Sequence, residues 1–172
     1  MDFLWSVISS LAPLLFLTSS AQAASIEIYL PATEAHETGA TKEVPLKTGE
    51  RVVVLAEPLA TITHEDVLAV HGHTTPYFTE GGRGRWVEQG EIYRVVFDLT
   101  PSAQRELDRM MARQCKSYTD LQIAIDGTIM DHLVVLGCPE SFRLTVSFVD
   151  ADEARNLARK FSPEPIRFEE AR

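Results

Sequence analysis

Two histidines, His71 and His73, have the residue type and spacing that best suit metal chemistry. In extended backbone, side chains at positions i and i+2 project to the same side and could share a zinc or copper ion. His64 or Asp66 lies a turn or two upstream, whereas the remaining histidines are far along the chain, so spacing fixes no third ligand. We therefore expect these histidines to be solvated or capping residues. A small periplasmic metal-binding protein that uses His71 and His73 is the alternative.

Residues for nucleophilic or acid–base catalysis show no recognisable arrangement. Serines and histidines are scattered, and there is no Gly-x-Ser-x-Gly elbow. Asp131 and His132 are neighbours, but adjacent strand residues point to opposite faces, and Asp126 is better explained by its turn with Gly127. The glycines at 81–84 lack the Gly-Lys-Ser/Thr ending of a phosphate loop. We predict no catalytic residue, no metal site, no cofactor and no enzymatic activity.

Cys115 and Cys138 are the two cysteines of the chain. An even number of cysteines in an exported protein is typical of disulfide bonding. The pair lacks the Cys-x-x-Cys spacing of a redox site. We predict a Cys115–Cys138 disulfide between the end of a helix and the end of a hairpin strand, with two free, buried thiols as the alternative.

The amino terminus has the pattern of a secretory signal peptide. Residues 3–17 are an uncharged apolar run, and Ala21-Gln22-Ala23 follows as a small-x-small site, so we predict cleavage between Ala23 and Ala24. The run of about 15 residues is short for a membrane span of about 20. No Lys or Arg precedes it, which keeps an uncleaved anchor as the alternative. We expect a periplasmic protein that has no stable membrane insertion after signal removal.

Charge excludes one class of partner. The net charge of -9 argues against nucleic-acid binding, which needs a basic face for phosphates. It also argues weakly against docking on an anionic membrane surface.

The elements that must position these residues follow from periodicity and caps. Alternation of apolar and polar residues predicts strands at 25–30, 51–55, 85–88, 91–99, 121–125, the segment after Gly127, and 142–148. The Asp126-Gly127 pair predicts a type I′ hairpin turn. Cap patterns predict a short helix from Thr63, a long helix from Thr100-Pro101 and a final helix from Asp150.

This order of elements predicts an α+β two-layer sandwich, close to the ferredoxin-like pattern, with helices packed on one mainly antiparallel sheet. The expected division of the 172 residues is as follows: a signal peptide at 1–23, an N-terminal extension with a possible edge strand at 24–50, the α+β domain at 51–162 and a C-terminal tail at 163–172.

Several segments resemble a known family. Residues 93–101 (YRVVFDLTP) and 121–128 (LQIAIDGT) resemble the head of the first periplasmic domain in the SecD subunit of the bacterial SecDF translocase. That head shows a strand ending in F-x-L-T, a helix and an A-I-x-L-D-G hairpin, and residues 144–158 resemble its following strand and helix. The resemblance covers about 59–161. Asp131-His132-Leu133 replaces the family's Ser-Ala-Pro, and the family's membrane spans have no counterpart in this sequence.

The resemblance implies the fold, the periplasm and a link to protein transport. In the family the head is a mobile domain thought to contact the emerging polypeptide, and it carries no catalytic residues. It therefore implies an exported, non-enzymatic binding module for polypeptide or an envelope protein partner. An exposed sheet edge could add a strand from an extended chain. A structural accessory to an envelope complex is a further possibility.

Overall fold

The fold is known from a computed structural model that describes residues 24–32, 39–81, 85–115, 119–135, 138 and 141–170. Its strands are β1 (Ser25–Tyr29), β2 (Thr41–Pro45), β3 (Arg51–Leu55), β4 (Ala60–Thr63), β5 (Val67–Glu80), β6 (Trp86–Leu99), β7 (Thr119–Ile125), β8 (Thr128–Val135), β9 (Thr145–Phe148) and β10 (Phe168–Glu170). The helices are α1 (Pro101–Gln114) and α2 (Ala151–Phe161), with a short 3₁₀ turn, η2 (His64–Asp66). The predicted signal peptide and Ala23 lie outside the described residues.

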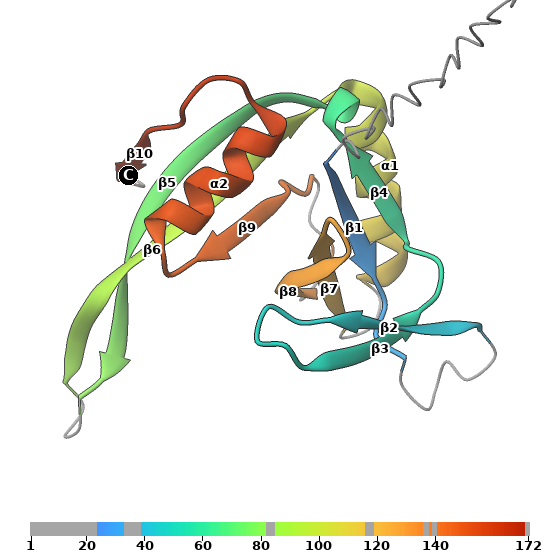
Figure 1. The fold of residues 1–172 in the computed structure, drawn as a ribbon, viewed down its shortest axis with the longest axis horizontal. Helices are drawn as coiled ribbons and strands as arrows, with labels where there is room; N and C mark the ends of the chain where they lie inside the picture. The colour runs from blue at the N-terminus through green and yellow to red at the C-terminus, as the bar shows by residue number, and fades with distance from the viewer. Residues whose placement is uncertain are drawn as a thin grey trace, which may run out of the picture.

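The strands form three sheets (Figure 1). One four-stranded sheet has the order β4-β1-β7-β8, and here we call it the first sheet. The second sheet has the order β10-β5-β6-β9, and α2 packs against β5, β6 and β9. The third is the two-stranded β2–β3 hairpin, and α1 packs against β4 and β6.

The predicted ferredoxin-like sandwich with one sheet is therefore wrong. The hairpin β7–β8 and the strand β9 lie in different sheets, although we expect them side by side from the sequence. The first sheet is also buried on both faces, because Tyr29, Ala124 and Ile129 pack with Val44 and Val54 of the β2–β3 hairpin. Alternation shows that a strand has an inner face, but it does not show which strand is its neighbour or what covers its other face.

Two further expectations about the chain ends are corrected. The segment 25–30 is not at an edge, because β1 pairs with both β4 and β7. Part of the expected tail is ordered, because Phe168–Glu170 form β10 and pair in parallel with β5. Gly72 makes this approach possible: a Cβ built there would lie 2.7 Å from the backbone oxygen of Arg167. The position of the domain boundaries remains a prediction.

The β5–β6 hairpin is longer than the sequence indicates. The expected helix from Thr63 is reduced to η2, in which the Asp66 carboxylate accepts hydrogen bonds from the backbone N–H and side chain of Thr63, and β5 begins at Val67. The two strands expected at 85–88 and 91–99 are one strand, β6, because a register shift and Gly90 at φ 141° accommodate the irregularity. The result is a ladder of two 14-residue strands.

The predicted long helices and the tight turn are confirmed. Thr100 and Asp150 cap α1 and α2 through their side chains, and each helix buries one apolar stripe. Asp126 and Gly127 have φ values of 49° and 77°, as a type I′ turn requires. The main core lies between the helices and the inner faces of both four-stranded sheets, with Phe97 packed edge-on against Phe161.

Candidate binding surfaces between the two sheets

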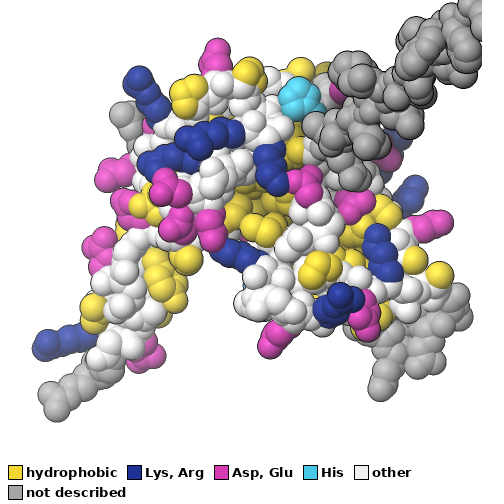
Figure 2. All heavy atoms as spheres, viewed as in Figure 1, with side chains coloured by type: hydrophobic (Ala, Val, Ile, Leu, Met, Phe, Trp, Pro, Cys, Tyr) yellow, Lys and Arg dark blue, Asp and Glu magenta, His cyan; other side chains and the backbone are white. Residues whose placement is uncertain are grey.

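An apolar hollow lies between α2 and the first sheet (Figure 2). Its volume is about 320 Å³, which is at the lower end of the range for ligand pockets. Its apolar lining consists of Ile125, Met130, Phe148 and Leu157. These residues come from β7, β8, β9 and α2, so the hollow exists only because elements distant in sequence meet there. We call it the apolar hollow below.

Two ion pairs flank the apolar hollow. Lys47 pairs with Glu153 of α2, and Lys160 of α2 pairs with Asp126 of the β7–β8 turn. The same Asp126 accepts a hydrogen bond from the backbone N–H of Ser25, so the turn residue also fixes the start of β1. All four ion-pair side chains are partly exposed, so the pairs are accessible from solvent and screened by salt. The ion pairs therefore tie α2 to the β2–β3 connection and to the β7–β8 turn without closing the hollow.

A second, polar cleft lies between the same two sheets and has a volume of about 760 Å³. Thr145 and Ser147 of β9 line this cleft, whereas Phe148 lines the apolar hollow, so by strand alternation the two cavities lie on opposite faces of β9. Both signs of charge are present in its lining, which includes Arg94, Arg143, Asp131, Glu169 and Glu170. We call it the polar cleft.

The polar cleft brings together three residues that the sequence singles out. His73, Asp131 and His132 all line it. The carboxylate of Asp131, however, accepts backbone hydrogen bonds from His132 at 2.8 Å and from Ser147 at 2.8 Å. It therefore links β8 to β9 and satisfies an N–H on the outer edge of β9, which is a structural task rather than acid–base chemistry.

The metal alternative has no support in the structure. His71 bonds to Asp98 through its Nε2 at 2.8 Å, while Asp66 is occupied with Thr63. Within the described residues, no group of three or more His, Cys, Asp or Glu side chains could hold a metal ion. Gly72 stands between His71 and His73 because β10 must pack there, which explains the motif without a ligand.

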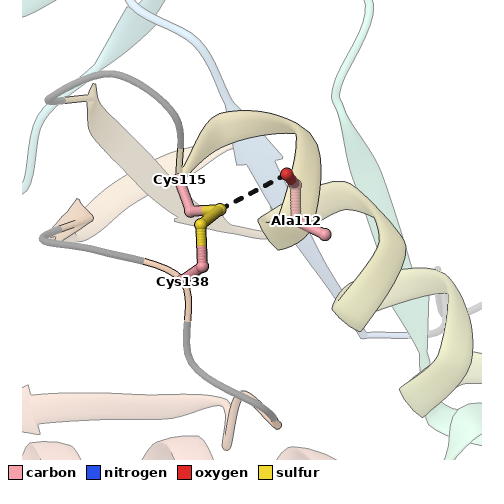
Figure 3. Close-up of a disulfide and its surroundings, with 3 residues drawn as sticks. All are labelled: Ala112, Cys115 and Cys138. Atoms are coloured by element: carbon pink, nitrogen blue, oxygen red, sulfur yellow. Dashed lines mark hydrogen bonds between the residues drawn. A yellow bond between two sulfur atoms is a disulfide. The ribbon is translucent and has the colours of Figure 1, made fainter.

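Figure 3 shows the two cysteines, Cys115 at the C-terminal end of α1 and Cys138 in the segment after β8. Cys115 and Cys138 form a disulfide with their Cα atoms 4.9 Å apart, and it joins the end of α1 to the segment after β8. The Sγ atom of Cys115 lies 3.3 Å from the carbonyl oxygen of Ala112; because a disulfide sulfur has no hydrogen to donate, this is a packing contact.

Helix α1 positions the segment between β8 and β9 through polar contacts that the sequence does not reveal. The Asp108 carboxylate accepts from the backbone N–H of Phe142 at 3.0 Å, and the Gln104 amide donates to the Phe142 carbonyl at 2.7 Å. The sequence places Asp108 on the wet side of the helix, because a helical pattern cannot show which backbone groups lie opposite. These contacts set where β9 begins, and hence where both cavities form.

A hydrogen bond between Tyr93 and Glu91 lies at the base of the exposed part of the β5–β6 hairpin. Tyr93 donates a hydrogen bond to Glu91 at 3.0 Å, and this bond to a carboxylate, together with desolvation, raises the pKa of the Tyr93 phenol. Burial raises the pKa of Tyr29 as well, while Lys42 bonds to its hydroxyl and lies over its ring. Both tyrosines are therefore neutral at physiological pH.

Neither helix of the described residues is long and apolar enough to cross a membrane.

The chain matches no protein-family model and no curated protein. Among solved structures, it is similar to one described as a membrane component SecDF that enhances protein export, with a TM-score of 0.50 and 16% identity over 84% of this chain and 64% of that chain. A crystal structure of SecDF in a super-membrane-facing form gives a TM-score of 0.49 and 14% identity over 84% of this chain and 19% of that one. This chain thus spans less than two thirds of each.

The similarity to SecDF that the sequence indicates is confirmed at the level of the fold. The structural match covers 84% of the chain, which is more than the stretch 59–161 that carries the sequence resemblance. The shared fold therefore extends beyond the predicted head-like segment. This agreement also explains why the motifs were recognisable although the ferredoxin-like description was wrong: the motifs report local strand–helix and hairpin units, not the arrangement of the sheets.

Proposed function

We propose that this chain is an exported, non-enzymatic binding module that contacts extended polypeptide or an envelope protein partner through the apolar hollow. The observation that carries the proposal is the hollow itself, an open apolar surface between two sheets with charged groups at both ends. Such a surface accepts apolar side chains of many sequences, while its charges orient the chain that carries them.

Two further observations support this proposal. The fold is similar to that of SecDF, which is described as enhancing protein export. The disulfide supports the periplasm as the compartment, because disulfides persist in oxidising environments.

The experiment measures binding of fluorescein-labelled synthetic peptides by fluorescence anisotropy. The main probe is an acetylated peptide of alternating valine and lysine, called here the valine–lysine peptide, and the control peptide replaces valine by serine. We expect binding of the first and not of the second, because only valine can occupy the apolar hollow.

A blocking variant locates the contact. Asn156 is exposed on α2 and lines the hollow, so Asn156→Phe covers the apolar lining without removing a core residue. Arg159→Phe is the matched control, because Arg159 is exposed on the same helix and does not line the hollow. We expect Asn156→Phe to weaken binding about tenfold or more and Arg159→Phe to leave it within twofold. Equal binding by both variants would show that the hollow is not the contact.

A further inference from the structure

The end of the β5–β6 hairpin forms an arm that projects from the body (Figure 1). We define the arm as residues 76–80 of β5 and 86–91 of β6, which pair from Pro76–Glu91 at its base to Glu80–Trp86 near its tip. Among the described residues, both helices lie against the body and the end of the hairpin extends beyond them (Figure 1), and every residue of the arm except Thr79 is exposed. The arm is therefore a two-stranded ribbon with both faces in solvent.

The arm carries a concentration of exposed apolar side chains. Tyr77, Phe78 and Val87 are 44%, 46% and 44% exposed, and Trp86 is 71% exposed. The register places Phe78 and Trp86 on one face and Tyr77 and Val87 on the other. Four large apolar residues clustered on one projecting element indicate an interaction surface rather than scattered surface hydrophobics.

No strand of the described residues pairs with the outer edge of β6 along the arm. β9 covers only Tyr93–Val96, and β10 covers only Gly72–Thr74 of β5. The Phe97 N–H bonds to the Leu144 carbonyl on the β9 side, so strand alternation turns the backbone groups of Glu91 toward the same, open side. The edge of β5 is less suitable, because Pro76 has no N–H to donate.

The charge of the arm selects among possible occupants. Glu80, Glu88 and Glu91 lie on the two strands of the arm, whereas Arg83 and Arg85 lie between these strands in the sequence. Natural proteins often protect an edge strand with lysine, and this edge carries acidic residues instead. Negative charge favours a lysine- or arginine-containing segment, and it disfavours an anionic lipid surface or the equally acidic arm of a second copy.

The open edge is continuous with the apolar hollow. Phe148 pairs with Tyr93 at the end of β9, and Phe148 also lines the hollow. The next residue outward on β6, Ile92, begins the open edge. A strand added there continues the line of β9, so one extended segment can contact both surfaces.

We propose that an extended polypeptide segment with apolar and basic residues adds as a strand to the outer edge of β6 along the arm, covering Trp86 as it does so. This proposal rests on the proposed polypeptide-binding function and adds a second contact surface with defined chemistry. Backbone hydrogen bonds make the contact tolerant of sequence, while the aromatic side chains and the glutamates favour apolar and basic residues.

The chain offers a built-in fluorescent reporter for this test. Its two tryptophans are Trp5 and Trp86, so the full chain carrying Trp5→Phe reports on Trp86 alone. We expect the unlabelled valine–lysine peptide to shift the Trp86 emission to the blue, because the exposed indole leaves water. A peptide of alternating valine and glutamate should bind about tenfold more weakly or worse, because its charges oppose those of the arm.

Backbone methylation tests strand addition itself. Every second residue of an extended peptide turns its N–H to the same edge, so methylating the valine nitrogens blocks one edge and methylating the lysine nitrogens blocks the other. We expect one of these two peptides to lose the Trp86 shift and the other to retain it. Retention by both, or equal loss by both, would contradict strand addition.

The remaining outcomes separate this proposal from its alternatives. If the peptide binds by anisotropy but Trp86 emission is unchanged, and Phe78→Ser binds like the parent, the arm proposal fails while the polypeptide-binding function stands. If no peptide binds, both fail.

A Trp86 shift on vesicles of phosphatidylglycerol and phosphatidylethanolamine without peptide would assign the arm to lipid. The Trp86 emission could also shift without peptide as the protein concentration rises. If sedimentation then showed dimers, the arm would be assigned to contact with a second copy.

Discussion

The two halves of the β5–β6 hairpin share one ladder but differ in everything that surrounds it. In the half near the body, α2 covers one face, β9 and β10 pair at the edges, and Val95 and Phe97 are almost fully buried. In the arm, the same two strands continue with large side chains exposed and edges unpaired in the described residues. The strands persist because the ladder is continuous, whereas burial depends on what packs beside it.

Apolar side chains therefore occur in the two halves of the hairpin for different reasons. Apolar residues in the inner half stabilise the fold by leaving water, at about 25 cal/mol per Å² of buried apolar surface. Apolar residues in the arm contribute little to folding and are best explained by a partner.

Truncation of one aromatic residue in each half should give the largest contrast. Phe97 is 1% exposed and Phe78 is 46% exposed. We expect Phe97→Ala to lower the free energy of unfolding by about 3–5 kcal/mol, and Phe78→Ala to change it by less than about 0.5 kcal/mol. Urea denaturation of both variants measures this. A large loss in Phe78→Ala would mean that the arm is part of the folding core.

The disulfide should have the next largest effect. Its cysteines are 23 residues apart, and a closed loop of this size stabilises a fold by roughly 3 kcal/mol. We expect the double variant Cys115→Ser/Cys138→Ser to lose about that much in urea denaturation without reductant, while the parent loses it when reduced. If reduction also destabilised the double variant, the bond would not be the cause.

The contact of β10 with the inner half should produce a smaller loss. Gly72→Ala places a methyl group 2.7 Å from the Arg167 oxygen, so we expect a loss of about 1–3 kcal/mol from overpacking. In a chain that ends at Pro165 this neighbour is missing, and the same substitution should have little further effect. Comparing Gly72→Ala in the two backgrounds gives the coupling, and equal losses in both would contradict the role of β10.

The smallest predicted effect is a titration at the boundary between the halves. The hydrogen bond from Tyr93 to Glu91 is the largest cause of the raised pKa of the Tyr93 phenol. Glu91→Gln removes the carboxylate, so the pKa of Tyr93 should fall toward its ordinary value of about 10. An NMR titration of the tyrosine ring measures it, and an unchanged pKa would show that Glu91 does not hold the base of the arm.

Local elements of this fold were predictable from the sequence, but their assembly was not. The caps Thr100 and Asp150 and the Asp126-Gly127 turn carry short-range signals that place both helices and the β7–β8 hairpin. Sheet membership depends on long-range pairing, which alternation leaves open. Tyr29 illustrates this, because the strand pattern at 25–30 gives no sign that Tyr29 is 1% exposed beneath the β2–β3 hairpin.

The candidate surfaces were less predictable than the fold. The apolar hollow joins Ile125, Met130, Phe148 and Leu157 from four elements, and each of these reads as an ordinary core residue in its own segment. The flanking cations Lys47 and Lys160 carry no motif. The arm did leave a signal in the sequence, since Tyr77 and Phe78 precede the glycines at 81–84 and lie outside every strand expected from alternation, whereas Trp86 falls in the strand expected at 85–88. Aromatic residues in such a position are unusual because burial cannot explain them.

Hydrogen–deuterium exchange of the full chain, with and without the valine–lysine peptide, tests whether one extended segment contacts both surfaces. We expect slower exchange in two places at once: residues 86–92 of β6, whose open edge gains hydrogen bonds, and the β9–α2 segment beside the apolar hollow. Helix α1 should exchange at the same rate in both states, because none of its residues lines the apolar hollow or lies on the arm. Protection confined to α1 or the polar cleft, or no protection when the peptide is bound, would contradict the proposal.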